Sequence, residues 1–195
     1  VRTIRGKKIG FIFQDPQTSL NPLFTIKDQL VETIQTHTDL DYNKALEKSI
    51  KLLTEVGIEN PHKRINDYPH QFSGGMRQRV VISLALCCEP ELLIADEPTT
   101  ALDVSIQSQI LELIKTLTKE RNLAVILITH DMGVISETAD RVGVMKNGVL
   151  VEIGLTKEIL TNPKEIYTKS LISSVPPTNK KILRFKIMEK RENSE

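Results

Sequence analysis

Apolar positions along the chain follow two patterns, which together predict an alternation of strands and helices. Short runs rich in apolar residues predict strands at 8–13, 92–95 and 123–129, and 92–95 and 123–128 are apolar throughout. Apolar residues at helical spacing predict helices from about 26, at 44–56, at 75–88 and after Asp103. Strands without apolar–polar alternation are typical of parallel sheets that helices cover on both faces. The pattern therefore predicts an α/β domain.

Breaker residues mark the segments between these elements. Prolines predict a loop over 14–25, and the segment 57–71 is irregular as well. Nearer the C-terminus, Asn147 and Gly148 stand between two β-rich runs and predict a tight hairpin over 141–154. Helices are expected around this hairpin at 132–138, 157–160 and 165–173.

The residues directly after the three strands carry amide, carboxylate and imidazole groups. Gln14 follows the first strand, Asp96 and Glu97 follow the second, and His130 follows the third. Open α/β sheets bind ligands at the carboxyl ends of their strands, so we expect these four side chains at one edge. The set suits nucleoside triphosphate hydrolysis, with Asp96 holding Mg²⁺ and Glu97 orienting or deprotonating water.

The other two residues complete this interpretation, although each feature alone also has an ordinary structural explanation. His130 suits contact with the terminal phosphate, and Gln14 can ligate metal or water through its carbonyl oxygen. Yet an Asp-Glu pair after a strand is often a pair of solvated loop charges. Thr129 or Asp131 can simply cap the next helix. The order and spacing of the whole set favour the chemical interpretation.

A phosphate-binding loop is the part of such a site that the sequence does not supply. No segment matches G-x-x-x-x-G-K-[ST]; the nearest, RGKKIG at 5–10, has no Ser or Thr after its lysines. A phosphate cradle needs successive backbone N–H groups in front of a helix, whereas Gly6 precedes a strand-like run. We predict a basic turn there, and we expect the phosphate loop to lie upstream of Val1.

Composition argues against a nucleic-acid-binding or a membrane-spanning protein. The 195 residues are 39% hydrophobic and 26% charged, as in ordinary globular domains. A net charge of +1, no Trp and 4% aromatic residues give no support to a nucleic-acid partner. The longest apolar runs are far shorter than the ~20 residues of a membrane span. Cys87 and Cys88 are expected on a buried helix face in a reducing compartment.

Five segments, in order, resemble the motifs of ATP-binding subunits of ABC transporters. The Q-loop is matched by FIFQDP, the signature motif by FSGGMRQR, the Walker B strand by LLIADEP, the D-loop by TALD and the switch motif by ITHD. Met76 stands where glutamine is commoner. The resemblance implies a P-loop NTPase-like ABC ATPase domain with a helical subdomain and a mostly parallel sheet flanked by helices. It implies that the N-terminal strands and phosphate loop are lacking here.

The resemblance implies a role for each matching residue. Gln14, Glu97 and His130 are then catalytic, and Asp96 and Gln14 are ligands of Mg²⁺. The residues implied to bind ATP are Ser73, Gly74, Gly75, Asp96 and Asp103. Because two domains of this family meet head to tail, the Ser-Gly-Gly turn is expected to contact ATP held by the opposite subunit.

The same resemblance divides the chain into three parts. Residues 1–154 correspond to a partial ABC ATPase domain, with the helical subdomain at about 15–88. Residues 155–178 correspond to a C-terminal extension, and 179–195 form a polar tail. Without a phosphate loop and the strand that carries it, we expect this chain alone to hydrolyse ATP poorly and to fold weakly.

Longer matches resemble one branch of the family, the importers of dipeptides and oligopeptides. They are QDPQTSLNP at 14–22, ADEPTTALDVSIQSQIL at 95–111 and NPKEIYTKSLISSVP at 162–176. This branch implies a motor subunit at the cytoplasmic face of the inner membrane. Its implied partners are a second, non-identical ATPase subunit, transmembrane permease subunits and, indirectly, a peptide-binding protein. Nickel importers share the branch, so the cargo stays open.

Two other functions are compatible with parts of the pattern. A soluble ABC-type ATPase of DNA repair would insert a long coiled coil between the Q-loop and the signature motif. The segment 15–72 shows no sustained heptads, which favours the transporter. An inactive remnant or regulatory fragment stays open because the phosphate loop is missing.

Overall fold

The computed structural model describes residues 4–100 and 102–174, apart from the side chain of Gln17. These residues form two compact units, which divide between His130 and Asp131. The predicted tail at 179–195 and the last part of the predicted extension, 175–178, lie outside the described residues. The boundaries inferred for the three parts of the chain stay predictions.

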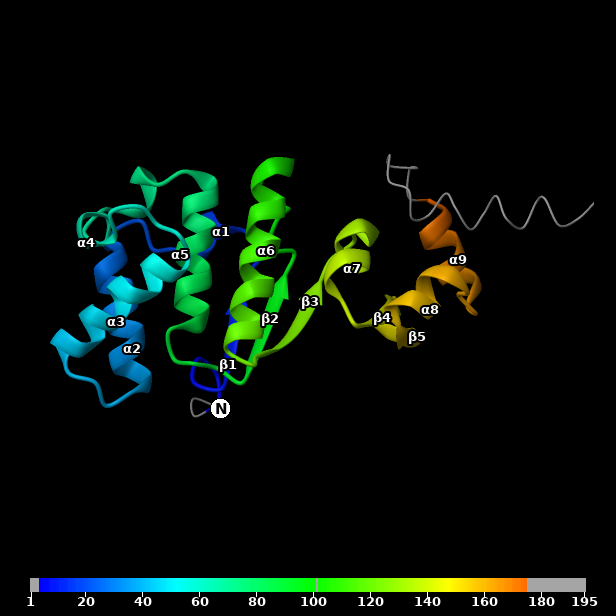
Figure 1. Cartoon of the computed structure of the whole chain (residues 1–195), viewed down its shortest axis with the longest axis horizontal. Coiled ribbons are helices and arrows are strands. Elements are labelled where there is room, and N and C mark those ends of the chain that lie inside the picture. Colours follow the sequence, from blue (N-terminus) through cyan, green and yellow to red (C-terminus); the bar gives the residue numbers. More distant parts are fainter. Residues whose placement is uncertain (1–3, 101, 175–195) are drawn as a thin grey trace, which may run out of the picture. The chain divides into compact units, whose positions relative to one another are not determined.

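The first unit contains a three-stranded parallel sheet (Figure 1). The central strand β2 (Leu92–Asp96) pairs with β1 (Ile9–Ile12) on one side and β3 (Ala124–Ile128) on the other. Because all three strands run in the same direction, their carboxyl ends meet at one edge. The predicted α/β class, the three strands and their parallel pairing are confirmed.

Helices of very different length connect these strands. They are α1 (Pro16–Ser19), α2 (Ile26–His37), α3 (Tyr42–Glu55), α4 (Pro61–Arg64), the 3-10 turn η1 (Pro69–Gln71), α5 (Gly74–Leu86) and α6 (Val104–Glu120). The long helices were predicted, but α1, α4 and η1 lie in segments predicted to be loops or irregular. A single turn is too short to show a hydrophobic period. Between residues 4 and 174, leaving aside 101, no helix is long and apolar enough to span a bilayer.

Side-chain caps define where the long helices begin. Thr25 and Asp28 form a capping box at the start of α2, and Asp41 accepts a hydrogen bond from the Lys44 N–H in α3. The predicted cap of α6 is confirmed, because the Asp103 carboxylate accepts from the Ile106 N–H at 3.0 Å. Each cap satisfies a backbone donor that the helix itself leaves without a partner.

One face of the parallel sheet is buried, and the other is open. Ile12 and Leu93 on the buried face join a single apolar cluster with α5 and α6. On the opposite face, Phe11 of β1 is 36% exposed. Phe11 pairs with Ile94 of β2, which in turn pairs with Ile126 of β3, and Ile126 is 51% exposed. The cover expected on both faces is therefore found on one face only among the described residues. An apolar run shows that both faces of a strand are apolar, but it does not identify what covers them.

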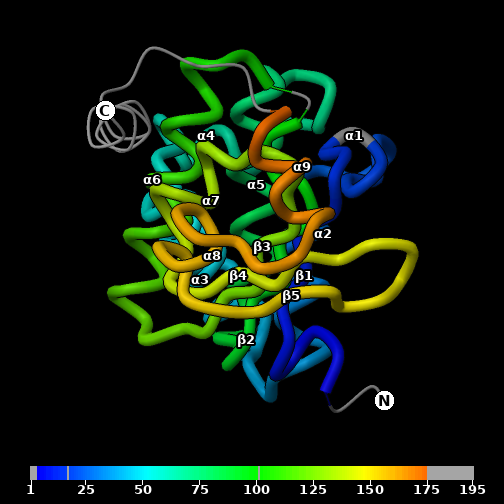
Figure 2. The backbone as a smooth tube through the Cα atoms, turned by 90° about the vertical axis from the view of Figure 1, so that its right-hand side faces the viewer, coloured from blue at the N-terminus to red at the C-terminus, as the bar shows by residue number. Residues whose placement is uncertain are grey.

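The second unit is built on a hairpin that Figure 2 shows as two adjacent strands. Its elements are α7 (Met132–Thr138), β4 (Arg141–Lys146), β5 (Val149–Leu155), α8 (Thr156–Thr161) and α9 (Ile166–Ser173). The turn residues have positive φ, 50° at Asn147 and 78° at Gly148, as a tight two-residue hairpin requires. The predicted hairpin and its three neighbouring helices are confirmed.

Glu152 of β5 connects the hairpin to α9. Its carboxylate accepts hydrogen bonds from the backbone N–H groups of Lys164 at 2.8 Å and Glu165 at 3.2 Å, at the start of the helix. The hydroxyl of buried Thr168 and these two N–H groups hold the pKa of Glu152 below its ordinary value of 4.5. The ionised carboxylate thus fixes the two residues that lead into α9, whose own N-cap residue Glu165 makes no side-chain capping hydrogen bond.

We expect Glu152→Gln to loosen the start of α9, because an amide accepts these hydrogen bonds less strongly than a carboxylate. The measurement is hydrogen exchange over 164–173, which should become faster, with the exposed Glu158→Gln as the matched control. Since the folded-state pKa is lowered, the stabilisation is present above about pH 4.5 and is lost as the pH falls below it. A difference that persisted unchanged in acid would contradict this explanation.

Candidate functional site

The backbone after β2 places Glu97 at the edge where the strands end. Its N–H donates to the Ile128 carbonyl at 2.9 Å, which extends the pairing of β2 with β3 by one residue. Glu97 has φ 45°, in the left-handed region that non-glycine residues seldom adopt. This conformation turns the chain out of the strand at the point where Gln14 and His130 also leave theirs.

Three side chains hydrogen-bond the Glu97 carboxylate. His130 Nδ1 lies 2.7 Å from Oε1, and Gln14 Nε2 donates to Oε2 at 2.7 Å. Thr100 Oγ1 donates to Oε2 at 2.9 Å. Because a carboxylate only accepts hydrogen bonds, the shared proton at His130 belongs to Nδ1. The predicted convergence of Gln14, Glu97 and His130 is thus present, and both oxygens of Glu97 are engaged.

These contacts determine the charge of the site. The pKa of Glu97 lies below its ordinary value, chiefly because His130 donates to the carboxylate, and Thr100 and Gln14 act in the same direction. The Glu97 side chain is only 22% exposed, whereas that of His130 is 75% exposed. Glu97 is therefore a carboxylate at neutral pH, and these hydrogen bonds make it a weaker base than a free one.

Asp96 is the last residue of β2 and lies opposite Ile128 in the register. Together with the amide oxygen of Gln14, it offers only oxygen donors at this edge. Mg²⁺ prefers such donors and usually takes one or two protein ligands, with phosphate and water completing its shell. No group of three His, Cys, Asp or Glu side chains in the described part of the chain is arranged as a metal site. The residues thus fit a nucleotide-bound Mg²⁺ better than a metal held by protein alone.

The other predicted ATP-binding residues lie at the starts of α5 and α6. Ser73 caps α5 by accepting from the Met76 N–H at 3.3 Å, while Asp103 caps α6. The first turns of the two helices pack closely, since a Cβ on Gly75 would lie 2.7 Å from Ile106 Cγ2. A Cβ on Gly74 would meet only Leu102, at 3.6 Å. A larger residue at position 75 would therefore collide with Ile106, whether or not a nucleotide is bound.

Sequence reasoning missed two residues that shape this site. Thr100 reaches Glu97 because the chain turns tightly, with the Thr100 N–H donating to the Glu97 carbonyl at 3.2 Å. Gln107 of α6 donates from its side-chain amide to the carbonyls of Thr99 at 3.0 Å and Leu102 at 3.1 Å. A polar residue three positions after Glu97 was a usable signal for Thr100. The sequence carried none for Gln107.

Comparison with known proteins identifies the family. A family model described as ABC transporter matches residues 1–100. The chain belongs to the ABC transporter family. This confirms the resemblance drawn from the five motifs between Gln14 and His130.

The names of individual relatives are consistent with this family. The chain is 54% identical over 176 residues to the dipeptide transport ATP-binding protein DppD of Bacillus subtilis (strain 168), covering 90% of this chain and 52% of that one. It is 52% identical over 176 residues to the oligopeptide transport ATP-binding protein OppD of the same organism, covering 90% and 49%. The chain spans about half the length of these curated relatives. They support the peptide-importer branch.

Solved ATP-binding cassettes of the family share the fold. A dimeric post-hydrolysis state of the cassette MJ0796, bound to ADP and Pi, superposes with a TM-score of 0.68 at 30% identity, over 79% of this chain and 65% of that chain. CbiO1 of Clostridium perfringens, part of the transporter complex cbiONQ, superposes with a TM-score of 0.70 at 30% identity, over 82% and 61%. The predicted ABC ATPase fold class is thus confirmed.

Alanine substitution should lower the stability of the fold at Gly75 but not at the adjacent Gly74. Gly75→Ala forces the β-branched Ile106 to move, and overpacking of this kind costs about 1–3 kcal/mol. Gly74→Ala makes only an ordinary contact, so its unfolding free energy should stay close to that of the wild type. Chemical denaturation of both variants makes this comparison, and equal destabilisation would show that the Ile106 contact is not the cause.

Removing the hydrogen-bond donors should raise the pKa of Glu97 in a defined order. His130→Ala is expected to raise it most and Thr100→Val less, since His130 makes the largest contribution. A carbon-13 NMR titration of glutamate side chains provides the measurement. If the Glu97 midpoint stayed the same in His130→Ala, the hydrogen bond would not be what holds the carboxylate ionised.

Proposed function

We propose that this chain is part of the ATP-hydrolysing motor subunit of an ABC importer for dipeptides or oligopeptides. The single observation that carries the proposal is the convergence of Gln14 and His130 on the Glu97 carboxylate at the strand ends. Its similarity to dipeptide and oligopeptide transport ATP-binding proteins supports the substrate class. The segment between Gln14 and Ser73 holds helices of at most 14 residues, which argues against the coiled coil of a DNA-repair ATPase.

Glu97 is the residue we assign to the attacking water. An ionised carboxylate beside the γ-phosphate can orient a water molecule and accept its proton. In the arrangement described here, both carboxylate oxygens already accept hydrogen bonds. These three donors use three of the about four lone-pair positions of the carboxylate, and Oε1, which accepts from His130 alone, keeps one for a water molecule. The donors also lower the basicity of Glu97, so the loss of one would make it a stronger base.

Gln14 is the donor best suited to leave Glu97. Its amide nitrogen binds Glu97, and the oxygen at the other end of the same amide is a suitable ligand for Mg²⁺. When bound, Mg²⁺ supplies charge neutralisation for the β- and γ-phosphates, with Asp96 as its protein carboxylate. Rotation of this one side chain would thus add a ligand to the metal shell and remove one of the two donors from Glu97 Oε2, which would raise the basicity of the carboxylate.

His130 keeps Glu97 oriented during this change. Its Nδ1–H stays on Oε1, so the carboxylate retains one fixed contact after Gln14 departs. The ring is largely exposed, and the Nε2–H that it carries when both nitrogens are protonated is the donor we assign to the terminal phosphate. The imidazole thereby couples the position of the base to the position of the phosphate.

A second ATPase subunit is part of the proposal. The starts of α5 and α6 present Ser73, Gly74 and Asp103, and the first-turn N–H groups of α5 favour an anion at this end of the helix. Gly74, where a Cβ would meet nothing closer than 3.6 Å, leaves room for a nucleotide held by the opposite subunit. We propose a related ATPase, permease subunits and, through them, a peptide-binding protein as partners at the cytoplasmic face of the inner membrane.

The decisive test is Glu97→Gln in the full-length protein, assembled with its partners. We expect ATP turnover to fall by at least ~10²-fold, because general-base catalysis contributes about 10²–10⁴-fold, while ATP binding stays close to wild type. The exposed Glu112→Gln in α6 is the matched control and should leave turnover unchanged. Undiminished hydrolysis in Glu97→Gln would refute the assignment.

A further inference from the structure

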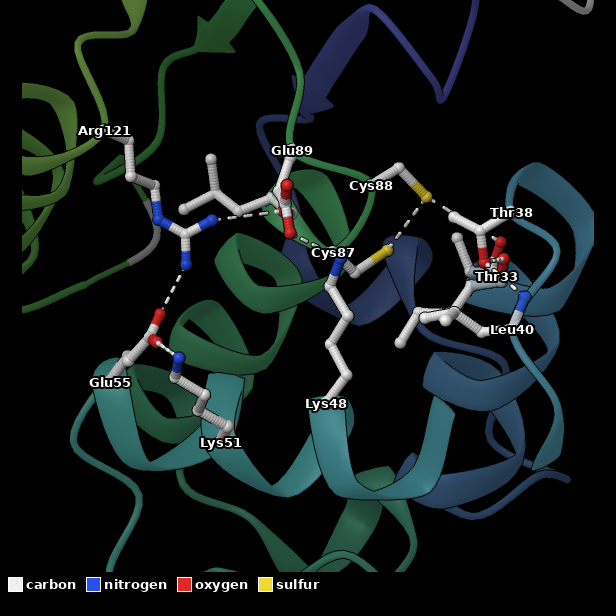
Figure 3. A network of polar contacts seen from close by, with 12 residues as sticks. Thr33, Thr38, Leu40, Lys48, Lys51, Glu55, Cys87, Cys88, Glu89 and Arg121 are labelled. Atoms are coloured by element: carbon white, nitrogen blue, oxygen red, sulfur yellow. Dashed lines mark hydrogen bonds and ion pairs between the residues drawn. The ribbon is translucent and has the colours of Figure 1, made fainter. Parts of the chain in front are cut away.

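Two adjacent thiols lie at the C-terminal end of α5, away from the catalytic residues. Cys87 and Cys88 are the only cysteines of the sequence, and their sulfur atoms are 3.6 Å apart (Figure 3). Cys87 is fully buried, whereas Cys88 is partly exposed. Cys87 Sγ lies 3.1 Å from the Leu84 carbonyl, and Cys88 Sγ lies 3.9 Å from the Thr33 carbonyl of α2. Both sulfurs are thus held in position by the backbone around them.

The distance between the sulfurs suits one bridging atom better than a disulfide. A disulfide needs sulfurs about 2.05 Å apart and Cα atoms at least about 4.4 Å apart, whereas adjacent Cα atoms are about 3.8 Å apart. A single thiophilic atom with two bonds of about 2.3 Å separates its sulfurs by about 3.3 Å at a right angle and by about 3.8 Å at a tetrahedral angle. The observed 3.6 Å lies within this range, which includes the angles of a pyramidal trivalent centre.

The number of available ligands selects the kind of atom. A structural Zn²⁺ takes four protein ligands, but no third His, Asp, Glu or Cys joins the two thiols within the described residues. A centre that brings its own third substituent needs only two sulfurs. Trivalent arsenic with one organic group has this valence, and it forms stable bonds to thiolate sulfur.

We propose that Cys87 and Cys88 form a dithiol site for monosubstituted trivalent arsenicals. Two S–As bonds form, the arsenic–oxygen bonds of R–As=O break, and the oxygen leaves as water with both thiol protons. Arsenic stays trivalent, so no oxidant or reductant takes part. The site is independent of the proposed ATPase function, since α5 has 13 residues and its ends are about 20 Å apart.

The surroundings indicate which thiol reacts first. The hydrogen bond from Cys87 and the charge of Lys48 lower the pKa of Cys88, while the contact with Cys88 and burial raise the pKa of Cys87. Lys48 is held nearby by Glu89, at 2.7 Å from Nζ to Oε1 (Figure 3). Cys88, the more exposed thiol, therefore attacks first. Cys87 then closes the ring, and its proton leaves with the arsenic-bound hydroxyl.

The test uses the full-length protein and phenylarsine oxide. We expect one phenylarsenic group on the peptide that contains both cysteines, as peptide mass spectrometry can show. Excess 2-mercaptoethanol should leave the group in place, whereas 1,2-ethanedithiol should remove it, because only a dithiol matches the chelate. A reaction that requires denaturation, or release by both thiols alike, would overturn the proposal.

Single-thiol variants separate chelation from simple thiol reactivity. In Cys88→Ala and Cys87→Ser, the reagent should be held at least ~10²-fold less tightly, since the second bond raises affinity by about 10²–10⁴-fold. Thermal unfolding checks that each variant folds, and Cys88→Ala changes the more exposed position. Retention equal to wild type in either folded variant would refute a two-sulfur site. If a variant does not fold, the competition between monothiol and dithiol on the wild type still decides.

Discussion

The parallel pairing of β2 with β1 and β3 is the constraint on which the rest of the site depends. It brings the chain at Gln14, Glu97 and His130 out of the sheet at one edge. The last contact of this pairing, from the Glu97 N–H to the Ile128 carbonyl, lies beyond the strand itself. It holds Glu97 in a left-handed conformation that costs about 1–2 kcal/mol for a residue with a side chain. Strain of this kind is typical of functional sites.

The consequence is a carboxylate that is held in position by hydrogen bonds at both of its oxygens. Its two oxygens accept from an imidazole, an amide and a hydroxyl, which together keep it ionised and lower its basicity. Oε1, which accepts from His130 alone, keeps a position at which a water molecule can donate. We propose that the position of Gln14 sets the basicity of Glu97, because its departure would remove one donor from Oε2.

Much of this arrangement could be predicted from the sequence, because its signals are local. The apolar runs gave the strands, and the polar residues after them gave Gln14, Asp96, Glu97 and His130. Thr100 and Gln107 were missed because their contacts depend on a turn and on a helix packed across the loop, which no period records. The reason for Gly75 was also beyond the sequence, since it is the Ile106 side chain on another helix. The open face of the sheet was missed for a similar reason: an apolar strand does not identify its cover.

The central claim is that Gln14 and His130 bind the same carboxylate, and a side-chain nitrogen-15 NMR titration tests it most directly. The resonances of Gln14 Nε2 and His130 Nδ1 are followed as the pH is lowered through the range where Glu97 takes up its proton. We expect both nitrogens to report one shared titration midpoint, at a lower pH than that of an ordinary glutamate. We also expect Glu97→Gln to abolish this transition at both nitrogens. Separate midpoints, or a shared transition that survives Glu97→Gln, would contradict the central claim.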